Sequence, residues 1–429
     1  MTRSLAPGAC LVSALFVVGC VGSENNLPGG GAGGSGGMTA GTGGSVVDAP
    51  VSSGTGGTEM PGTGGTVSTD AGMEMPPAGG TGGMPADPGS EGDGDRVIGP
   101  NYTSDPRLTD PAAPKGTRFS FTMMGSQSQI YKGINGNYSR GVSVYVPMQY
   151  SPDKPAALMV TQDAMGGQLA GVLDNLINKK MLPVIVVLFV SNGGGDAVGS
   201  ERGLEYDTVS GLFAEYAMKE VLPRAIMEAK TQKNIDLKIT DDPEGHGVLG
   251  GSSGGAASFS MAWWHPDYFR KVITYSGTYV TQVPAGSPFP HGCWIYHDID
   301  PYNATTPNGL IVANCEPTGG FKGDSNPGPC DTPLTQAKCE AVTGCQWNTK
   351  VNRPLRIWHE SGTNDLGAGG APSGYRNFDL ANQRMAAAFK LRGYHYHYDH
   401  AMGAGHVDGR AVNQTIVEAM LYVWRGYPL

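Results

Sequence analysis

Three residue types, far apart in the chain, could together carry out nucleophilic catalysis. The segment Val248-Leu-Gly-Gly-Ser-Ser253-Gly-Gly255 holds a G-x-S-x-G pattern after an apolar run and before a small-residue helix start. Such a strand-to-helix turn is so sharp that glycines must surround the serine, whose hydroxyl then projects clear of the sheet. We therefore predict Ser253 as the nucleophile. Because the chain has 67 glycines, an ordinary Gly-Ser turn remains the alternative.

A serine hydroxyl becomes strongly nucleophilic only when an imidazole accepts its proton and a carboxylate orients that imidazole. Asp365 follows a predicted strand that ends at Glu360, so it is the predicted carboxylate. His406 lies in a glycine-containing loop before the last predicted helix, so it is the predicted base. The alternatives are Glu360, Asp399 or Asp408 for the carboxylate, and His395, His397 or His400 for the imidazole.

The oxyanion formed by the attack needs two backbone N–H donors. Gly254, directly after the predicted nucleophile, is expected to supply the first. The second is expected from the loop after an early strand, Gln162-Asp163-Ala164-Met165, with Ala164 or Met165 as the donor. Asp163 is expected to hold this loop in place.

Alternating predicted strands and helices explain how these residues are positioned. Residues 184–190 are apolar without alternation, as in a strand covered on both faces. Strand, helix, strand, helix over this length predicts a doubly wound, mostly parallel sheet, whose ligands lie at the carboxyl ends of the strands. Strands are expected at 119–124, 142–147, 157–161, 184–190, before Ser253, and at 272–276, 355–360 and 394–398; helices at 169–179, 213–221 (ending before Pro223), after Ser253 through Trp264, and at 378–391 and 412–424.

The first 95 residues have the features of an export signal and a tether. Residues 1–19 contain a short apolar stretch and end before Cys20 in small residues, which predicts a lipoprotein signal peptide and acylation of Cys20. Plain secretion is the alternative. Residues 20–95 are rich in Gly, Thr and Ser, and this composition predicts a disordered linker. We expect a globular domain over 96–429, anchored to the bacterial cell envelope.

The net charge and the cysteines indicate which partners and which cross-links to expect. The net charge of −9 and the absence of a basic stripe argue against a nucleic-acid partner. Five cysteines lie within residues 284–353, which predicts a disulfide-rich insertion with two bridges and one free thiol in an exported protein. No C-x-x-C pair supports zinc binding as the alternative. These cysteines are Cys293, Cys315, Cys330, Cys339 and Cys345.

As a set, these motifs resemble a bacterial serine esterase family that includes enterochelin-esterase-like hydrolases, feruloyl esterases and acetylxylan esterases. The matching segments are Gln162-Asp163, Arg202 with Glu205-Tyr206-Asp207, Gly251-Ser-Ser253-Gly-Gly255, Gly362-Thr-Asn-Asp365 and Gly405-His406. The resemblance implies an α/β-hydrolase fold, an acyl-enzyme on Ser253 assisted by His406 and Asp365, and no cofactor. Ala164 departs from the glycine common at that position in the family. Arg202 and Glu205 are expected to hold a loop by an ion pair or to touch substrate.

Export and tethering favour an extracellular substrate, such as an acylated polysaccharide or an aromatic ester. The alternatives are an enterochelin-type lactone hydrolase, a peptidase, and a non-catalytic binding lipoprotein on the same fold. A complete Ser, Asp, His set argues against the last of these, because a decayed site has no reason to keep all three.

Overall fold

The computed structural model describes most of the predicted globular domain. The described residues are 88–132, 138–162, 166–193, 202–280, 311, 315–318, 330, 335–347, 353–368 and 377–429. The chain divides into two units, residues 1–79 and 80–429, and the described residues all belong to the second. The predicted signal peptide, Cys20 and the linker up to residue 87 therefore lie outside the described residues.

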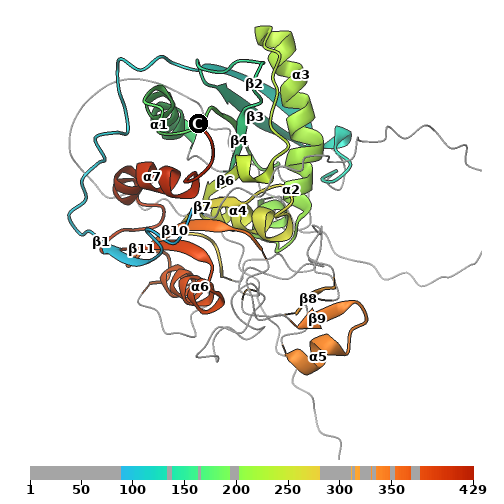
Figure 1. Ribbon diagram of the computed structural model, residues 1–429, viewed down its shortest axis with the longest axis vertical. Helices are drawn as coiled ribbons and strands as arrows, with labels where there is room; N and C mark the ends of the chain where they lie inside the picture. Colours follow the sequence, from blue (N-terminus) through green and yellow to red (C-terminus); the bar gives the residue numbers. More distant parts are fainter. Residues whose placement is uncertain are drawn as a thin grey trace, which may run out of the picture. The chain divides into compact units, whose positions relative to one another are not determined.

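A nine-stranded sheet forms the centre of the domain, with the order β1-β11-β10-β7-β6-β4-β5-β3-β2 (Figure 1). β3 pairs antiparallel with β2 and β5, and the other neighbours pair in parallel. This confirms the predicted α/β class with a mostly parallel sheet. The strands are β1 (Gly94–Ile98), β2 (Thr117–Met124), β3 (Ser139–Val146), β4 (Ala157–Gln162), β5 (Ile185–Val190), β6 (His246–Gly251), β7 (Lys271–Tyr275), β10 (Arg356–Gly362) and β11 (His395–Ala401).

Helices cover both faces of this sheet. Val248 of β6 packs in the cluster formed with α2 (Leu212–Tyr216), α3 (Leu222–Lys233), α4 (Ser253–Trp264) and α6 (Phe378–Arg392). The next residue, Leu249, packs on the other face with α1 (Gly166–Asn178) and α7 (Gly409–Val423), which Figure 1 shows together on one side of the sheet. Both faces are therefore apolar, which explains the unbroken apolar runs of the central strands. Among the described residues, no helix combines the length and apolar composition that crossing a bilayer requires.

Two elements differ from the prediction. The helix expected to end before Pro223 continues through a π-helical turn, Ala217–Val221, into α3. Pro223 is tolerated because it stands in the first turn of α3, where its missing N–H has no acceptor to lose. Strand β1, which the sequence did not reveal, pairs in parallel with β11. Because Asp93 Oδ2 also lies 2.7 Å from His395 Nδ1, the domain begins before residue 96.

The predicted insertion contains two disulfides. Cys315 pairs with Cys339, and Cys330 with Cys345. The first bridge joins the short strand β8 (Cys315–Pro317) to the helix α5 (Gln336–Glu340). The second bridge ends on the short strand β9 (Cys345–Trp347), which pairs antiparallel with β8. The two predicted bridges are thus confirmed, and Cys293 lies outside the described residues.

Candidate active site

The structure brings a serine, a histidine and an aspartate together at the carboxyl edge of the sheet, and the serine is Ser252. Its Oγ lies 2.8 Å from Nε2 of His406. Nδ1 of the same imidazole lies 2.6 Å from Oδ1 of Asp365. The prediction of Ser253 as the serine facing the base is therefore wrong by one residue.

Ser252 occupies the turn between β6 and α4 in a strained conformation. Its φ of 55° and ψ of −130° fall where side chains other than glycine are rarely found. The turn is tight: a Cβ on Gly250 would lie 2.2 Å from the carbonyl oxygen of Gly254. These two glycines frame Ser252 in the pattern G-x-S-x-G. The strained backbone lifts the Ser252 hydroxyl toward the imidazole, as a nucleophile at this turn requires.

The sequence contains two overlapping matches to the motif, and its pattern alone does not choose between them. Residues 250–254 place Ser252 at the centre, whereas 251–255 place Ser253 there. The choice depends on where the strand ends, because the central serine must stand between strand and helix. Here the N–H of Ser252 donates to the carbonyl of Tyr275 at 2.9 Å, and α4 begins at Ser253. Ser253 is therefore the first residue of the helix, and it is 1% exposed.

His406 and Asp365 have the geometry of a base and its orienting acid. An ionised carboxylate only accepts hydrogen bonds, so Nδ1–H of His406 donates to Asp365 and leaves Nε2 free to accept the Ser252 proton. The Asp365 side chain is fully buried, and its Oδ1 also accepts the N–H of Leu366 at 2.7 Å. The His406 side chain keeps 23% exposure, so a substrate can reach it.

Moving the serine by one position also moves the expected oxyanion donor. The residue after Ser252 is Ser253, so the N–H at this position belongs to Ser253 and not to Gly254. As the first residue of α4, Ser253 has an N–H without an intrahelical acceptor, directed along the positive end of the helix dipole. Asp163, Ala164 and Met165, expected to provide the second donor, lie outside the described residues.

Arg202 directly precedes a π-helical turn, Gly203–Asp207, that contacts α4, and Glu205 lies within this turn. Nη1 of Arg202 donates to Oγ of Ser253 at 2.5 Å, which puts a guanidinium beside the turn that carries Ser252. Glu205 is buried, forms an ion pair with Arg140 and accepts the N–H of Gly193 at 3.1 Å. Glu205 thus holds the chain after β5, in agreement with the predicted loop-holding role.

Apart from Glu360, the alternative residues have other partners. Asp399 binds Arg96 at 2.7 Å, and Asp408 caps α7 through Arg410. The three histidines considered as alternatives also have partners. His395 contacts Asp93, and His400 contacts Asp379. His397 contacts the carbonyl of Gly92 and the carboxyl of Asp399.

Glu360, the second choice for the acid, lies fully buried within β10. Neither of its carboxyl oxygens has a hydrogen-bond partner among the described residues. Burial, followed by the nearby charges of Asp365, Asp399 and Asp408, raises its pKa well above the ordinary value. Glu360 is therefore a buried carboxyl beside the site with a raised pKa, and sequence reasoning gave no sign of this.

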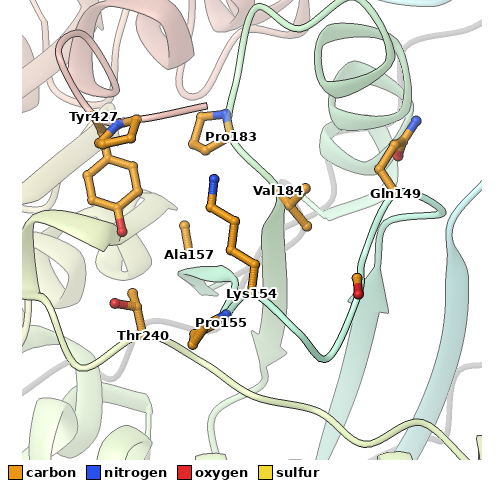
Figure 2. Close-up of a pocket in the computed structure, with 10 residues that line it drawn as sticks. Gln149, Lys154, Pro155, Ala157, Pro183, Val184, Thr240 and Tyr427 are labelled. Atoms are coloured by element: carbon orange, nitrogen blue, oxygen red, sulfur yellow. The ribbon is translucent and has the colours of Figure 1, made fainter.

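A separate pocket lies at the opposite, amino edge of the sheet, beside the starts of β4 and β5. Its volume is about 390 Å³, and Figure 2 shows the Lys154 side chain extending between Tyr427, Thr240 and Val184. None of the catalytic candidates lines it. The described part of the chain also contains no group of three or more His, Cys, Asp or Glu residues that could hold a metal ion.

A doubly wound sheet on which serine, aspartate and histidine follow one another in that chain order, each at a strand end, defines the α/β-hydrolase class. Within this class, the family described as "Putative esterase" matches residues 135–413, well over half of the chain. The chain belongs to this esterase family, which confirms the predicted resemblance. No curated protein matches the sequence.

Several solved structures are similar to this one. An enterobactin esterase from Shigella flexneri is 16% identical with a TM-score of 0.44, over 74% of this chain and 61% of that one. A feruloyl esterase module from Clostridium thermocellum, complexed with sinapinate, is 15% identical with a TM-score of 0.42, over 76% of this chain and 95% of that one. The chain thus spans less than two thirds of the Shigella enzyme. The functional argument rests on the site and on the family match.

Proposed function

We propose that this protein is a serine carboxylic-ester hydrolase that works through an acyl-enzyme on Ser252. The observation that carries the proposal is the pair of contacts made by one imidazole, 2.8 Å to Ser252 Oγ and 2.6 Å to Asp365 Oδ1. A buried carboxylate, a partly exposed imidazole and a hydroxyl on a strained turn form a relay that can activate the hydroxyl.

In the first half of the proposed reaction, Ser252 Oγ attacks the ester carbonyl carbon while its proton passes to Nε2 of His406. A C–O bond forms, and the carbonyl π electrons move onto the oxygen. The N–H of Ser253 stabilises this oxyanion, together with a second N–H assigned to Ala164 or Met165. When the oxyanion collapses, the bond to the alcohol breaks, and the alcohol oxygen leaves with the proton held by His406.

In the second half, His406 takes a proton from water, whose oxygen attacks the acyl carbon. Collapse of the second tetrahedral species breaks the bond to Ser252 Oγ, which recovers its proton from Nε2. Asp365 stays ionised throughout and stabilises the imidazolium formed in each half. Arg202 is assigned a supporting role: by holding Ser253 Oγ, it fixes the residue whose N–H faces the oxyanion.

The proposal extends to location and substrate class. The lipobox-like sequence before Cys20 and the Gly-rich segment after it support an exported enzyme held to the cell envelope by acyl chains on Cys20. An enzyme so placed meets esters outside the cytoplasm, so we assign it acylated polysaccharides or aromatic esters as substrates. An enterochelin-type lactone is the competing substrate, because it would be opened by the same acyl-enzyme chemistry.

The full-length protein tests this function with p-nitrophenyl acetate, methyl ferulate, acetylated xylan and a catecholate trilactone. A burst of p-nitrophenol equal to the enzyme concentration is expected, followed by slower turnover that Ser252→Ala abolishes. Turnover of all esters by Ser252→Ala at the rate of the parent enzyme would refute the acyl-enzyme. A preference for the trilactone would change only the proposed substrate and would leave the acyl-enzyme mechanism in place.

A further inference from the structure

The segment that precedes the family-matched residues contacts the loop that carries His406. We define the strap as residues 94–105, which comprise β1 and the seven residues after it, and the His loop as residues 401–408. The family match begins at residue 135, so the strap lies before the residues that the family model covers. Its last strand pair, Ile98 with Ala401, ends where the His loop begins.

The strap continues its contacts beyond the end of the sheet. The N–H of Met402 donates to the carbonyl of Ile98 at 2.8 Å. The hydroxyl of Tyr102 donates to the carbonyl of Met402, also at 2.8 Å. Both polar backbone groups of Met402 are thus held by the strap. Two of the next three residues in the His loop are glycines, whose backbones are free unless something fixes them.

Tyr102 also contacts Arg410, which binds the far end of the His loop. The guanidinium of Arg410 lies over its ring, 5.3 Å from the ring centre, and Nη2 of Arg410 donates to Asp408 Oδ2 at 2.6 Å. The same Asp408 oxygen accepts the N–H of Gly405 at 3.1 Å, one residue before His406. Tyr102 therefore contacts one end of the His loop directly, at Met402, and reaches the other end through Arg410.

The other side of the His loop rests on the strand ends that carry the rest of the site. The N–H of Asn364 donates to the carbonyl of Ala404 at 2.9 Å, and the N–H of Val407 donates to Ser276 Oγ at 2.9 Å. The loop that carries the imidazole is thus held between the loop that carries Asp365 on one side and the strap on the other. A displacement of about 1 Å can cost roughly 100-fold in rate, so the strap side matters to the chemistry.

We propose that the strap is a positioning element for the catalytic base, and that the Tyr102 hydroxyl is the positioning group that fixes the His loop for proton transfer. The proposal rests on the proposed function of His406. The pKa of Tyr102 is raised to about 12, chiefly by burial. Its hydroxyl therefore remains a donor at every pH of a practical assay.

Tyr102→Phe in the full-length protein removes the hydroxyl and keeps the ring over Arg410. The matched control is Tyr150→Phe, because the Tyr150 hydroxyl also donates to a backbone carbonyl, that of Asp236 at 2.7 Å. Tyr150 follows β3, which runs antiparallel to β5, so it lies at the sheet edge opposite His406. Both variants are measured per active site, with the p-nitrophenol burst as the titration.

We expect kcat of Tyr102→Phe to fall about tenfold with KM within about twofold of the parent, since positioning the base matters in the transition state. Its rate of labelling by a fluorophosphonate should fall by the same factor, because that reaction also needs His406 to activate Ser252. In proton NMR, the His406 Nδ1–H signal should broaden. None of these readouts should move in Tyr150→Phe, even if both variants lose the same thermal stability.

Equal kcat and equal labelling rates for the two variants would overturn the proposal, as would a rise in KM at constant kcat. Ser252→Ala, run beside them, separates this failure from that of the proposed function. If Ser252→Ala is inactive and Tyr102→Phe is unaffected, only the strap proposal is lost. If Ser252→Ala keeps the parent's activity, the acyl-enzyme itself is lost, and the positioning role with it.

Discussion

The adjacent serines at positions 252 and 253 allow a sharp test of the site, because each can be truncated without changing the other. Ser252→Ala removes the hydroxyl that lies 2.8 Å from His406 Nε2. In a comparable triad, loss of the nucleophile lowers kcat about 10⁶-fold. Ser253→Ala removes only a hydroxyl that accepts from Arg202 and leaves the backbone N–H in place.

The expected size of the second effect follows from that single contact. A hydrogen bond to a charged group contributes about 1.5–3 kcal/mol. If the whole of this were lost from the transition state, the rate would fall between about 10-fold and 150-fold. Ser253→Ala should therefore retain at least about 10⁴ times the activity of Ser252→Ala.

Burst kinetics with p-nitrophenyl acetate measure both variants. Fluorophosphonate labelling followed by fragmentation of the peptide around residue 252 identifies the modified residue directly. The label should appear on Ser252 in the parent and in Ser253→Ala, and nowhere in this peptide of Ser252→Ala. Circular dichroism shows whether each variant is folded. A folded Ser253→Ala without activity or label, beside an active Ser252→Ala, would refute the assignment.

Three further outcomes are expected. Asp365→Asn should lower kcat about 10⁴-fold at unchanged thermal midpoint, because the amide favours the wrong imidazole tautomer; a loss below tenfold would contradict the relay. Burial raises the pKa of Glu360 well above its ordinary 4.5. Above pH 4.5 the unfolded chain therefore releases a proton that the folded protein keeps. The free energy of unfolding then falls as the pH rises from about 4.5 toward the raised pKa. Glu360→Gln should then gain unfolding free energy relative to the parent between pH 5 and pH 8, measured by urea titration, and a difference independent of pH would oppose this. Non-reducing peptide mapping should recover Cys315 joined to Cys339 and Cys330 joined to Cys345, and any other pairing of these four would contradict the structure.

The sequence predicted best those elements that are buried on both faces. Strand β5 has the sequence Ile-Val-Val-Leu-Phe-Val and is buried at every residue but one, so its apolar run is continuous and easy to recognise. Asp365 and His406 were found because each follows a predicted strand, and parallel strands direct their following loops to one edge. The positions of both residues therefore depended on strand order and strand ends, which the pattern does predict.

Prediction from the sequence failed where contacts between distant residues determine the secondary structure. Strand β1 has the sequence Gly-Asp-Arg-Val-Ile, of which only Ile98 is fully buried. The charges that make it look like linker are satisfied only in the fold, as when Arg96 binds Asp399 at 2.7 Å across 303 positions. The helix end predicted before Pro223 was wrong for a similar reason. A proline marks the end of a helix only if it does not stand in the first turn of the next helix.

The identity of the serine depends on a chain of backbone contacts that no local motif records. At the carboxyl edge, the N–H of Ser252 donates to Tyr275, that of Ser276 to Glu360, and that of Thr363 to Ala401. Each strand end is thus bonded to the next, from the serine turn through β7 and β10 to the His loop. Because sheet register fixes these contacts, a shift of one residue in β6 would place Ser253 at the turn and turn Ser252 away from the imidazole. The register of four neighbouring strands, and not the glycine pattern around the serines, is therefore what makes Ser252 the residue that faces the base.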